Sequence, residues 1–250
     1  MYPIIELGPL NLGSGALLLV IAVVIGHTQF ERIARKRGDD ELEQRARRCA
    51  PFALLGAAIG ARLWYGLFNW DMYGQSPGLF LALRLGDLAW PGALIGGALA
   101  GYAYLRLRRL DAATAPLADA AALALPPAQA VAALGLLLSG EAPGAPTDVP
   151  WALPLFGVPR HPVPLYYLLA ALVTWGMLVW FAPRVTRPGS LAVIYLALQG
   201  SALLLLEALR VDSLVTVGGI RAAQIVGLAM LLIALRQKRA PAVQQSDDGG

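Results

Sequence analysis

Six ionisable side chains from four separate regions of this chain lie within or beside long apolar segments, on one predicted face of the membrane. Ionisable groups are costly in or near lipid, so each one marks a candidate functional position. Arginine guanidinium groups pair well with phosphate, and a carboxylate beside them can hold them in place or accept a proton. The residue types therefore predict a site for an anionic lipid with a candidate base nearby. The six residues are Arg62, Glu141, Arg160, His161, Glu207 and Arg210.

Several of these residues also have a structural interpretation when each is taken alone. Glu207 and Arg210 are three residues apart, so on a helix they face the same way and can form a local ion pair. Arg62 can extend its guanidinium to the lipid headgroups. His161 can be an interfacial histidine without a further role. Taken together, the six residues favour the lipid site over separate structural roles.

The elements that must position these side chains are apolar helices. The chain has 250 residues, of which 57% are hydrophobic and only 14% charged, whereas a soluble domain carries about 25% charged residues. Its mean hydropathy is +0.59, and apolar runs of about 20 residues, long enough to cross a bilayer, recur along it. The predicted helical segments are Leu12–Phe30, Ala50–Phe68, Leu88–Leu105, Leu117–Leu138, Pro164–Phe181, Leu191–Leu209 and Ala222–Leu235.

These segments predict an all-α, polytopic membrane protein with about seven transmembrane helices. Residues 1–239 form a single helical domain in this prediction, and the polar residues 240–250 form a disordered tail. Pro126 and Pro127 lie inside the fourth segment and are expected to kink it or split it in two. Glycine and alanine recur at short spacings in the second and third segments, which allows helix backbones to approach each other closely.

The distribution of lysine and arginine predicts the orientation of the helices. The first, third and fifth loops and the C-terminal tail together hold fifteen of these residues, against four in the other loops, and the twentieth, Arg62, lies within a helix. By the positive-inside rule the basic loops are cytoplasmic, so the N-terminus lies outside and the C-terminus in the cytoplasm. The six candidate residues then gather at the outer face of the membrane.

Charge and cysteine content argue against other kinds of site. The formal net charge is +4 and the isoelectric point is about 9.5, but the basic residues form short clusters beside apolar runs, which indicates topology and not nucleic-acid binding. The single cysteine, Cys49, excludes an intramolecular disulfide and a cysteine-based metal site. An unrelated transporter is disfavoured because no internal repeat is visible and the charges lie near one face.

Several stretches between about Ile5 and Leu235 contain most of the candidate residues. They are Gly8-Pro-Leu, Gly60-Ala-Arg-Leu-Trp-Tyr65-Gly-Leu-Phe, Pro91-Gly-Ala-Leu-Ile-Gly-Gly97, Ser139-Gly-Glu141 with Pro146-Thr-Asp-Val-Pro-Trp151, Arg160-His-Pro162 leading to Leu165-Tyr166, and Glu207-Ala-Leu-Arg210-Val-Asp212. Their order and spacing resemble those of the bacterial prolipoprotein diacylglyceryl transferases, a family that likewise has seven helices and an outer N-terminus.

The resemblance implies a transfer reaction at the outer leaflet of the bacterial cytoplasmic (inner) membrane. Family members move the diacylglyceryl group of phosphatidylglycerol to the thiol of the lipobox cysteine in a preprolipoprotein and release glycerol 1-phosphate. The implied partners are therefore phosphatidylglycerol, a lipobox peptide and membrane lipid, with no nucleic acid. No metal or soluble cofactor is implied.

The resemblance also implies roles for residues at matching positions. Arg210 would neutralise the phosphate, Glu207 would orient it, and Glu141 would line the lipid site, so these three are the candidate catalytic residues. The other residues implied in substrate binding, at the lipid site and its entrance, are Arg62, Gly92, Gly140, Arg160 and His161.

The chain departs from the family at several polar positions. Its third-helix motif begins with Pro91 in place of a histidine, and its fourth helix has Ala133 and Leu136 in place of an arginine and an asparagine. A tyrosine of the first helix is replaced near Gly15, and Tyr167 stands where the family has a glutamate. An arginine that pairs with phosphate contributes about 1.5–3 kcal/mol to binding. The loss of several such groups together is expected to lower or abolish transfer activity.

Two hypotheses for the function follow. In the first, the chain is a diacylglyceryl transferase that uses the retained Glu141, Glu207 and Arg210. In the second, it is a degenerate family member that binds an anionic phospholipid or a lipoprotein precursor without catalysis. The retained residues favour the first hypothesis, and the missing polar groups favour the second.

Overall fold

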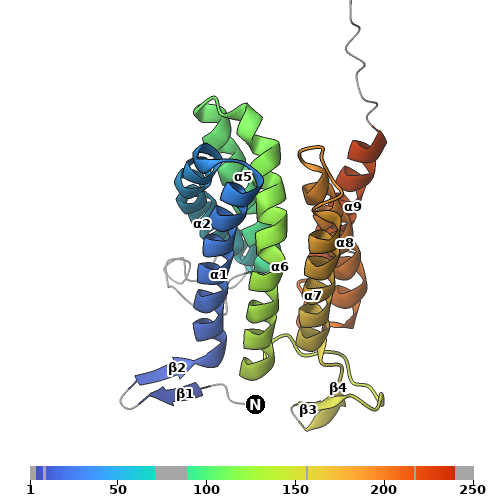
Figure 1. The fold of residues 1–250 in the computed structure, drawn as a ribbon. Coiled ribbons are helices and arrows are strands. Elements are labelled where there is room, and N and C mark those ends of the chain that lie inside the picture. The colour runs from blue at the N-terminus through green and yellow to red at the C-terminus, as the bar shows by residue number, and fades with distance from the viewer. Residues whose placement is uncertain (1–3, 8–9, 71–88, 156, 217, 240–250) are drawn as a thin grey trace, which may run out of the picture.

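The computed structural model describes residues 4–7, 10–70, 89–155, 157–216 and 218–239, and in these ranges the chain is mainly helical (Figure 1). Two short antiparallel hairpins pair β1 Ile4–Leu7 with β2 Leu10–Gly13, and β3 Leu153–Leu155 with β4 Val158–Arg160. The helices, including the 3-10 turns η2 and η3, are α1 Ser14–Arg37, α2 Asp40–Phe68, α5 Trp90–Leu107, η2 Asp111–Ala113, α6 Thr114–Ser139, α7 Val163–Phe181, α8 Ser190–Leu206, η3 Glu207–Leu209 and α9 Ala222–Arg239.

Each of the seven predicted apolar segments overlaps one of the long helices. Among the described residues, five elements are long and apolar enough to cross a membrane, namely α1, α2, α6 with η2, α7, and α8 with η3. The apolar part of α9, Ala222–Gln237, is shorter, and α5 is not among the five. The structure therefore shows an all-α polytopic membrane protein with five candidate spans, whereas seven crossings and the orientation of the termini stay predictions. Leu88 and the predicted tail 240–250 lie outside the described residues.

The first loop, predicted between Phe30 and Ala50, is almost entirely helical, so these boundaries were wrong. Only residues 38–39 separate α1 from α2. The carboxylate of Asp39 accepts a hydrogen bond from the backbone N–H of Leu42 at 2.7 Å and caps the start of α2. Glutamate–arginine pairs four residues apart then support the first turns of α2. The basic residues counted in this loop therefore lie on two helix ends.

Helix α6 runs unbroken through Pro126 and Pro127, so the predicted split does not occur. The helix packs against α1, α7 and α8. Its Asp119 is 2% exposed and accepts hydrogen bonds from the backbone N–H groups of Gly189 and Ala192 at 2.8 and 2.9 Å. These bonds tie α6 to the first turn of α8, where unpaired N–H groups and the helix dipole favour a negative charge.

Paired glycines allow α2 and α5 to approach each other closely. A Cβ atom added at Gly60 would lie 2.3 Å from the carbonyl oxygen of Gly92, and one at Gly96 would lie 2.2 Å from that of Gly56. Contacts this short do not occur for real Cβ atoms, so a larger residue would force the two backbones apart. The spacing of small residues thus produces the close helix approach that the sequence predicts.

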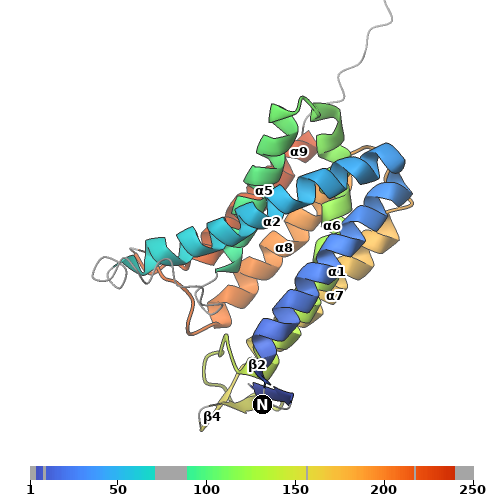
Figure 2. The same ribbon diagram turned by 90° about the vertical axis from the view of Figure 1, so that its left-hand side faces the viewer.

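The helices run between two ends of the molecule. The lower end in Figure 1 carries both hairpins and the connections from α6 to α7 and from α8 to α9. The upper end carries the turns from α1 to α2, from α5 to α6 and from α7 to α8. Figure 2 shows that α1 and α2 diverge from their common turn. Most of the predicted site residues belong to segments at the lower end.

A methyl group at Gly96 is expected to separate α2 from α5. Gly96→Ala places a carbon 2.2 Å from a backbone oxygen, and overpacking of this kind costs about 1–3 kcal/mol. We expect the variant to unfold at a lower temperature than the parent, measured by circular dichroism in one detergent. Gly176→Ala in α7 is the matched control, since no atom lies within 4 Å of its added Cβ and alanine favours helix. Equal melting temperatures for the parent and Gly96→Ala would contradict the packing argument.

Candidate functional site

The carboxylate of Glu207 is buried at the point where α8 passes into η3. Glu207 is 1% exposed, and both of its side-chain oxygens have hydrogen-bond partners. The hydroxyl of Tyr167 in α7 donates to Oε2 at 2.9 Å, and Nη1 of Arg210 donates to Oε1 at 3.2 Å. Buried charges are tolerated when they are paired and hydrogen-bonded in this way. The ion pair expected from the three-residue spacing is therefore present, and Tyr167 joins it to α7.

The guanidinium of Arg210 lies between two carboxylates. In addition to its bond with Glu207, its Nε and Nη2 donate to the two carboxylate oxygens of Asp212 at 2.8 and 3.2 Å, in a bidentate arrangement. Burial by itself would lower the pKa of Arg210, but the hydrogen bond to Asp212 and the negative charges of Glu207 and Asp212 raise it above the usual arginine value. Arg210 is therefore a firmly cationic group at this end of the molecule.

Backbone hydrogen bonds join three segments that are far apart in the sequence. Residues 143–147, which follow α6, form bonds of 2.8–3.0 Å with residues 209–211 on one side and with residues 159–161 on the other. Gly144 lies between the two neighbours, and a Cβ atom there would be 2.3 Å from the carbonyl oxygen of His161. The motifs around residues 141, 160 and 207 thus meet at the lower end in Figure 1.

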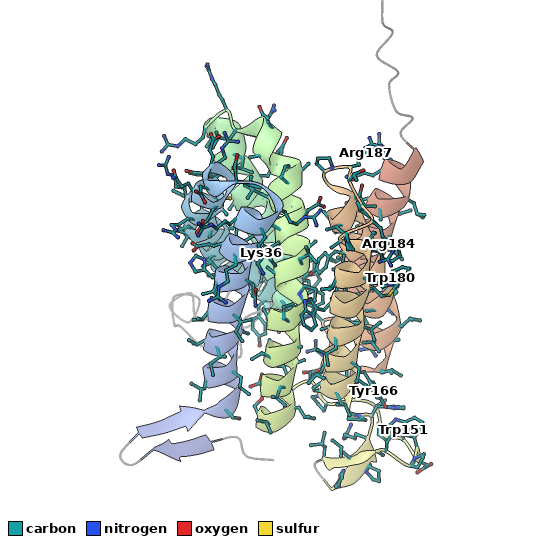
Figure 3. The ribbon with its side chains drawn as sticks, viewed as in Figure 1. Lys36, Trp151, Tyr166, Trp180, Arg184 and Arg187 are labelled. Carbon is teal, nitrogen blue, oxygen red and sulfur yellow. The ribbon has the colours of Figure 1, made fainter. Side chains whose placement is uncertain are left out.

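Arg160 and His161 are both half-buried and held by residues of the same end. Nη1 of Arg160 donates to the carbonyl oxygen of Gly144 at 3.1 Å, while its buried Nε has no hydrogen-bond partner among the described residues. Nδ1 of His161 lies 3.1 Å from the hydroxyl of Tyr166, which also accepts a hydrogen bond from Nε1 of Trp151 at 2.7 Å. Figure 3 shows Trp151 and Tyr166 together at this end.

Gly140 and Glu141 lie where α6 ends. Gly140 has φ +76°, a left-handed conformation that glycine adopts without strain and that commonly ends helices. The backbone N–H of Glu141 donates to the carbonyl oxygen of Leu136 at 3.0 Å. The side chain of Glu141 is exposed, and its Oε1 is 3.6 Å from the position that a Cβ would take at Gly15. Glu141 is thus a solvent-accessible carboxylate beside the start of α1.

Arg62 and Gly92 belong to the α2–α5 pair instead. Gly92 lies against the carbonyl oxygen of Gly60 and the side chain of Trp64, so it allows α2 and α5 to pack closely. Its role in substrate binding stays a prediction. Arg62 is half-buried, two residues beyond Gly60. The structure therefore links six of the eight predicted site residues through adjoining segments and places these two on another helix pair.

The sequence analysis missed three residues of this group. Tyr167 was considered only as a replacement, because nothing in the spacing connects it with Glu207, which lies 40 positions away. Asp212 could have been found from its place two residues after Arg210. Arg221 was counted only as a loop charge, but its Nη1 donates to the carbonyl oxygen of Arg210 and brings a second guanidinium to the cluster.

Apolar residues occupy the positions of the missing family side chains. Pro91 is buried in the first turn of α5, Ala133 is 3% exposed in α6, and Leu136 is half-buried. Across the described ranges, no group of three or more histidine, cysteine, aspartate or glutamate side chains is arranged to hold a metal ion. The described polar side chains at the lower end supply guanidinium, carboxylate, phenol and imidazole groups.

Comparison with known proteins places this arrangement in a family. The chain matches the family model for prolipoprotein diacylglyceryl transferase over residues 3–237. A phosphatidylglycerol–prolipoprotein diacylglyceryl transferase from Clostridioides difficile is 33% identical over 84% of this chain and 81% of its own length. Proteins of the same name from Trichormus variabilis and Thermosynechococcus vestitus are 32% and 33% identical over 93% and 92% of this chain, and over 86% and 88% of their own lengths. This chain therefore belongs to the prolipoprotein diacylglyceryl transferase family.

Proposed function

We propose that this protein transfers the diacylglyceryl group of phosphatidylglycerol to the lipobox cysteine thiol of a prolipoprotein. The cysteine sulfur forms a bond to the terminal glyceryl carbon, the bond from that carbon to the phosphate oxygen breaks, and glycerol 1-phosphate leaves. The thiol proton passes to a base. The observation that carries the proposal is the cluster of Glu207, Arg210 and Asp212 at the end of a candidate membrane helix, in a chain whose relatives carry this enzyme name.

The proposal includes an orientation in the bacterial inner membrane. The lower end in Figure 1 faces outward, the helical domain of residues 1–239 crosses the membrane seven times, and the C-terminus is cytoplasmic. The distribution of basic residues supports this, because Lys36, Arg184 and Arg187 lie toward the upper end in Figure 3, as the positive-inside rule requires for a cytoplasmic face. The transfer then takes place at the outer leaflet.

In this proposal Arg210 binds the phosphate of phosphatidylglycerol and stabilises the charge of the leaving group. Its bonds to Glu207 and Asp212 use three of its five N–H donors. The side chain of Asp212 is 43% exposed, against 2% for Glu207, so Asp212 is the carboxylate that a lipid phosphate can displace. Cations held in place where negative charge develops are an effective means of lowering a reaction barrier.

Glu141 and Glu207 have different roles in the proposal. Both oxygens of Glu207 are engaged by Tyr167 and Arg210, and its side chain is buried, so Glu207 positions the guanidinium. Glu141 is exposed beside the start of α1 and is free to meet the peptide thiol. We therefore assign proton transfer to Glu141.

The alternative is a family member that binds the lipid or the precursor without catalysis. The observation that favours it is the apolar character of the positions where the family has polar groups, with Ala133 and Pro91 both buried. These positions offer no donor or acceptor side chain that could take over a lost contact. Binding without turnover would then depend on Arg210 and its neighbours.

Replacement of Arg210 should weaken both lipid binding and transfer. Loss of a charge-assisted contact of about 1.5–3 kcal/mol predicts a fall in kcat/KM of about 10- to 150-fold for Arg210→Ala. The measurement is transfer of labelled diacylglyceryl to a lipobox peptide by purified protein in nanodiscs. Arg187→Ala, at the opposite end in Figure 3, is the control with the same change of charge. If the parent makes no product but binds phosphatidylglycerol, and Arg210→Ala loses that binding, the non-catalytic alternative replaces the transferase proposal.

The two glutamate variants should fail in different ways. Glu141→Gln removes the proton acceptor, so we expect kcat to fall with little change in melting temperature. Its rate should recover as the pH rises toward about 8.5, the ordinary pKa of a cysteine thiol, because the peptide then ionises without help. Glu207→Gln loses the charge-assisted bond to Arg210, which is worth about 1.5–3 kcal/mol, while Arg210 keeps its pair with Asp212, so we expect this variant to melt at a lower temperature than the parent. If the Glu141→Gln variant has the parent's rate at neutral pH, Glu141 is not the proton acceptor.

A further inference from the structure

A cavity lies between α2 and α5 at the end opposite the candidate transfer site. Its volume is about 410 Å³. The residues from α2 recur at spacings of three and four, so they share one face of the helix, and the others come from the last turn of α5 and the residues after it. The lining residues are Glu41, Gln44, Arg45, Arg48, Tyr104, Arg108 and Leu110.

The cavity presents an excess of positive charge. Arg45 is paired with Glu41, but Arg48 and Arg108 have no carboxylate partner among the described residues. The guanidinium of Arg108 lies 5.9 Å from the centre of the Tyr104 ring, which stabilises its position through a cation–π contact. Three guanidinium groups and one carboxylate leave a net charge of +2 in the lining. Guanidinium groups that are not engaged by carboxylates are suited to phosphate.

Two neighbouring arginines of the same end, Arg35 and Arg47, differ from Arg48 and Arg108 because they have carboxylate partners. Arg35 pairs with Asp40 and Glu43, and Arg47 pairs with Glu31 and Glu43. Those guanidinium groups already have anionic partners within the protein. Arg48 and Arg108 have no such carboxylate partner among the described residues, and both line the cavity.

The wall of the cavity becomes apolar within one helical turn. Phe52 follows Arg48 by four residues on the same face of α2, and its ring stacks on Tyr104 with centroids 4.7 Å apart. Phe52 is 49% exposed and Leu107, next to Arg108, is 84% exposed. A ligand with a phosphate group and attached hydrocarbon chains matches this change from guanidinium to apolar surface. A free phosphate ion would leave the apolar part unused.

We propose that this cavity binds the headgroup of an anionic glycerophospholipid from the leaflet at the α1–α2 end, separately from the lipid consumed by the transfer reaction. The phosphate contacts Arg48 and Arg108, and the acyl chains lie along Phe52 and Leu107. A lipid bound here joins α2 to α5 and its following turn. This site holds a lipid as a structural ligand of the α2–α5 pair.

The test measures lipid binding in a protein whose transfer site has been disabled. In the Arg210→Ala background, native mass spectrometry in detergent counts phosphatidylglycerol and phosphatidylcholine molecules bound per protein. We expect Arg48→Gln with Arg108→Gln to weaken phosphatidylglycerol binding at least tenfold and to leave phosphatidylcholine binding unchanged. The matched control is Arg184→Gln with Arg187→Gln, which removes the same charge near the same end from the α7–α8 half (Figure 3); we expect it to change binding less than twofold.

A second variant should strengthen the binding of phosphatidylglycerol to this cavity. Glu41→Gln frees Arg45 from its ion pair, so phosphatidylglycerol should bind more tightly. An equal loss of binding in the Arg184/Arg187 control, or no loss in the Arg48/Arg108 variant, would overturn the proposal in favour of general electrostatic attraction. Displacement of the lipid by glycerol phosphate at the same concentration would show that a soluble phosphate, and not a lipid, is the ligand. Melting temperatures equal to that of the background protein would show that both variants are folded.

Discussion

The buried carboxylate of Glu207 is the interaction on which the rest of the candidate site depends. Removing a carboxylate from water costs several kcal/mol, and only a paired, hydrogen-bonded environment offsets that cost. Tyr167 and Arg210 supply this environment, so α7 and the end of α8 must keep their relative places. Arg210 in turn belongs to residues 209–211, which pair with residues 143–147. The ionic cluster therefore fixes Arg210 near α7, and backbone hydrogen bonds join its segment to the one that follows α6.

A tyrosine at position 167, where the related family has a glutamate, changes the charge around Glu207 and Arg210. The resemblance to the family places a glutamate here, and a second carboxylate beside Glu207 would repel it unless one of the two were protonated. A phenol donates a hydrogen bond instead and adds no charge. With Asp212 already on the other edge of Arg210, the tyrosine keeps the negative charge around the guanidinium at two carboxylates. In the proposed function, a lipid phosphate that approaches Arg210 would meet less repulsion than it would beside three carboxylates.

The two ends of the bundle use arginine for different purposes. At the lower end Arg160, Arg210 and Arg221 donate to backbone or carboxylate oxygens and fix the loops. At the upper end Arg35, Arg45 and Arg47 form ion pairs along α1 and α2. Between the ends, glycine pairs set the distance between α2 and α5. The glycine contacts between α2 and α5 and the polar cluster at the lower end thus lie in different parts of the fold.

The sequence by itself determined the helical segments, the Glu207–Arg210 pair and the family, because hydropathy and i,i+3 spacing are local properties. It misjudged the first loop, since charged residues that pair along one helix do not interrupt it. The hairpins, the bond from Tyr167 to Glu207 and the pairing of residues 143–147 with two distant segments were decided only by the tertiary structure. These contacts join residues up to 68 positions apart, and no local pattern specifies which distant partner satisfies a buried polar group.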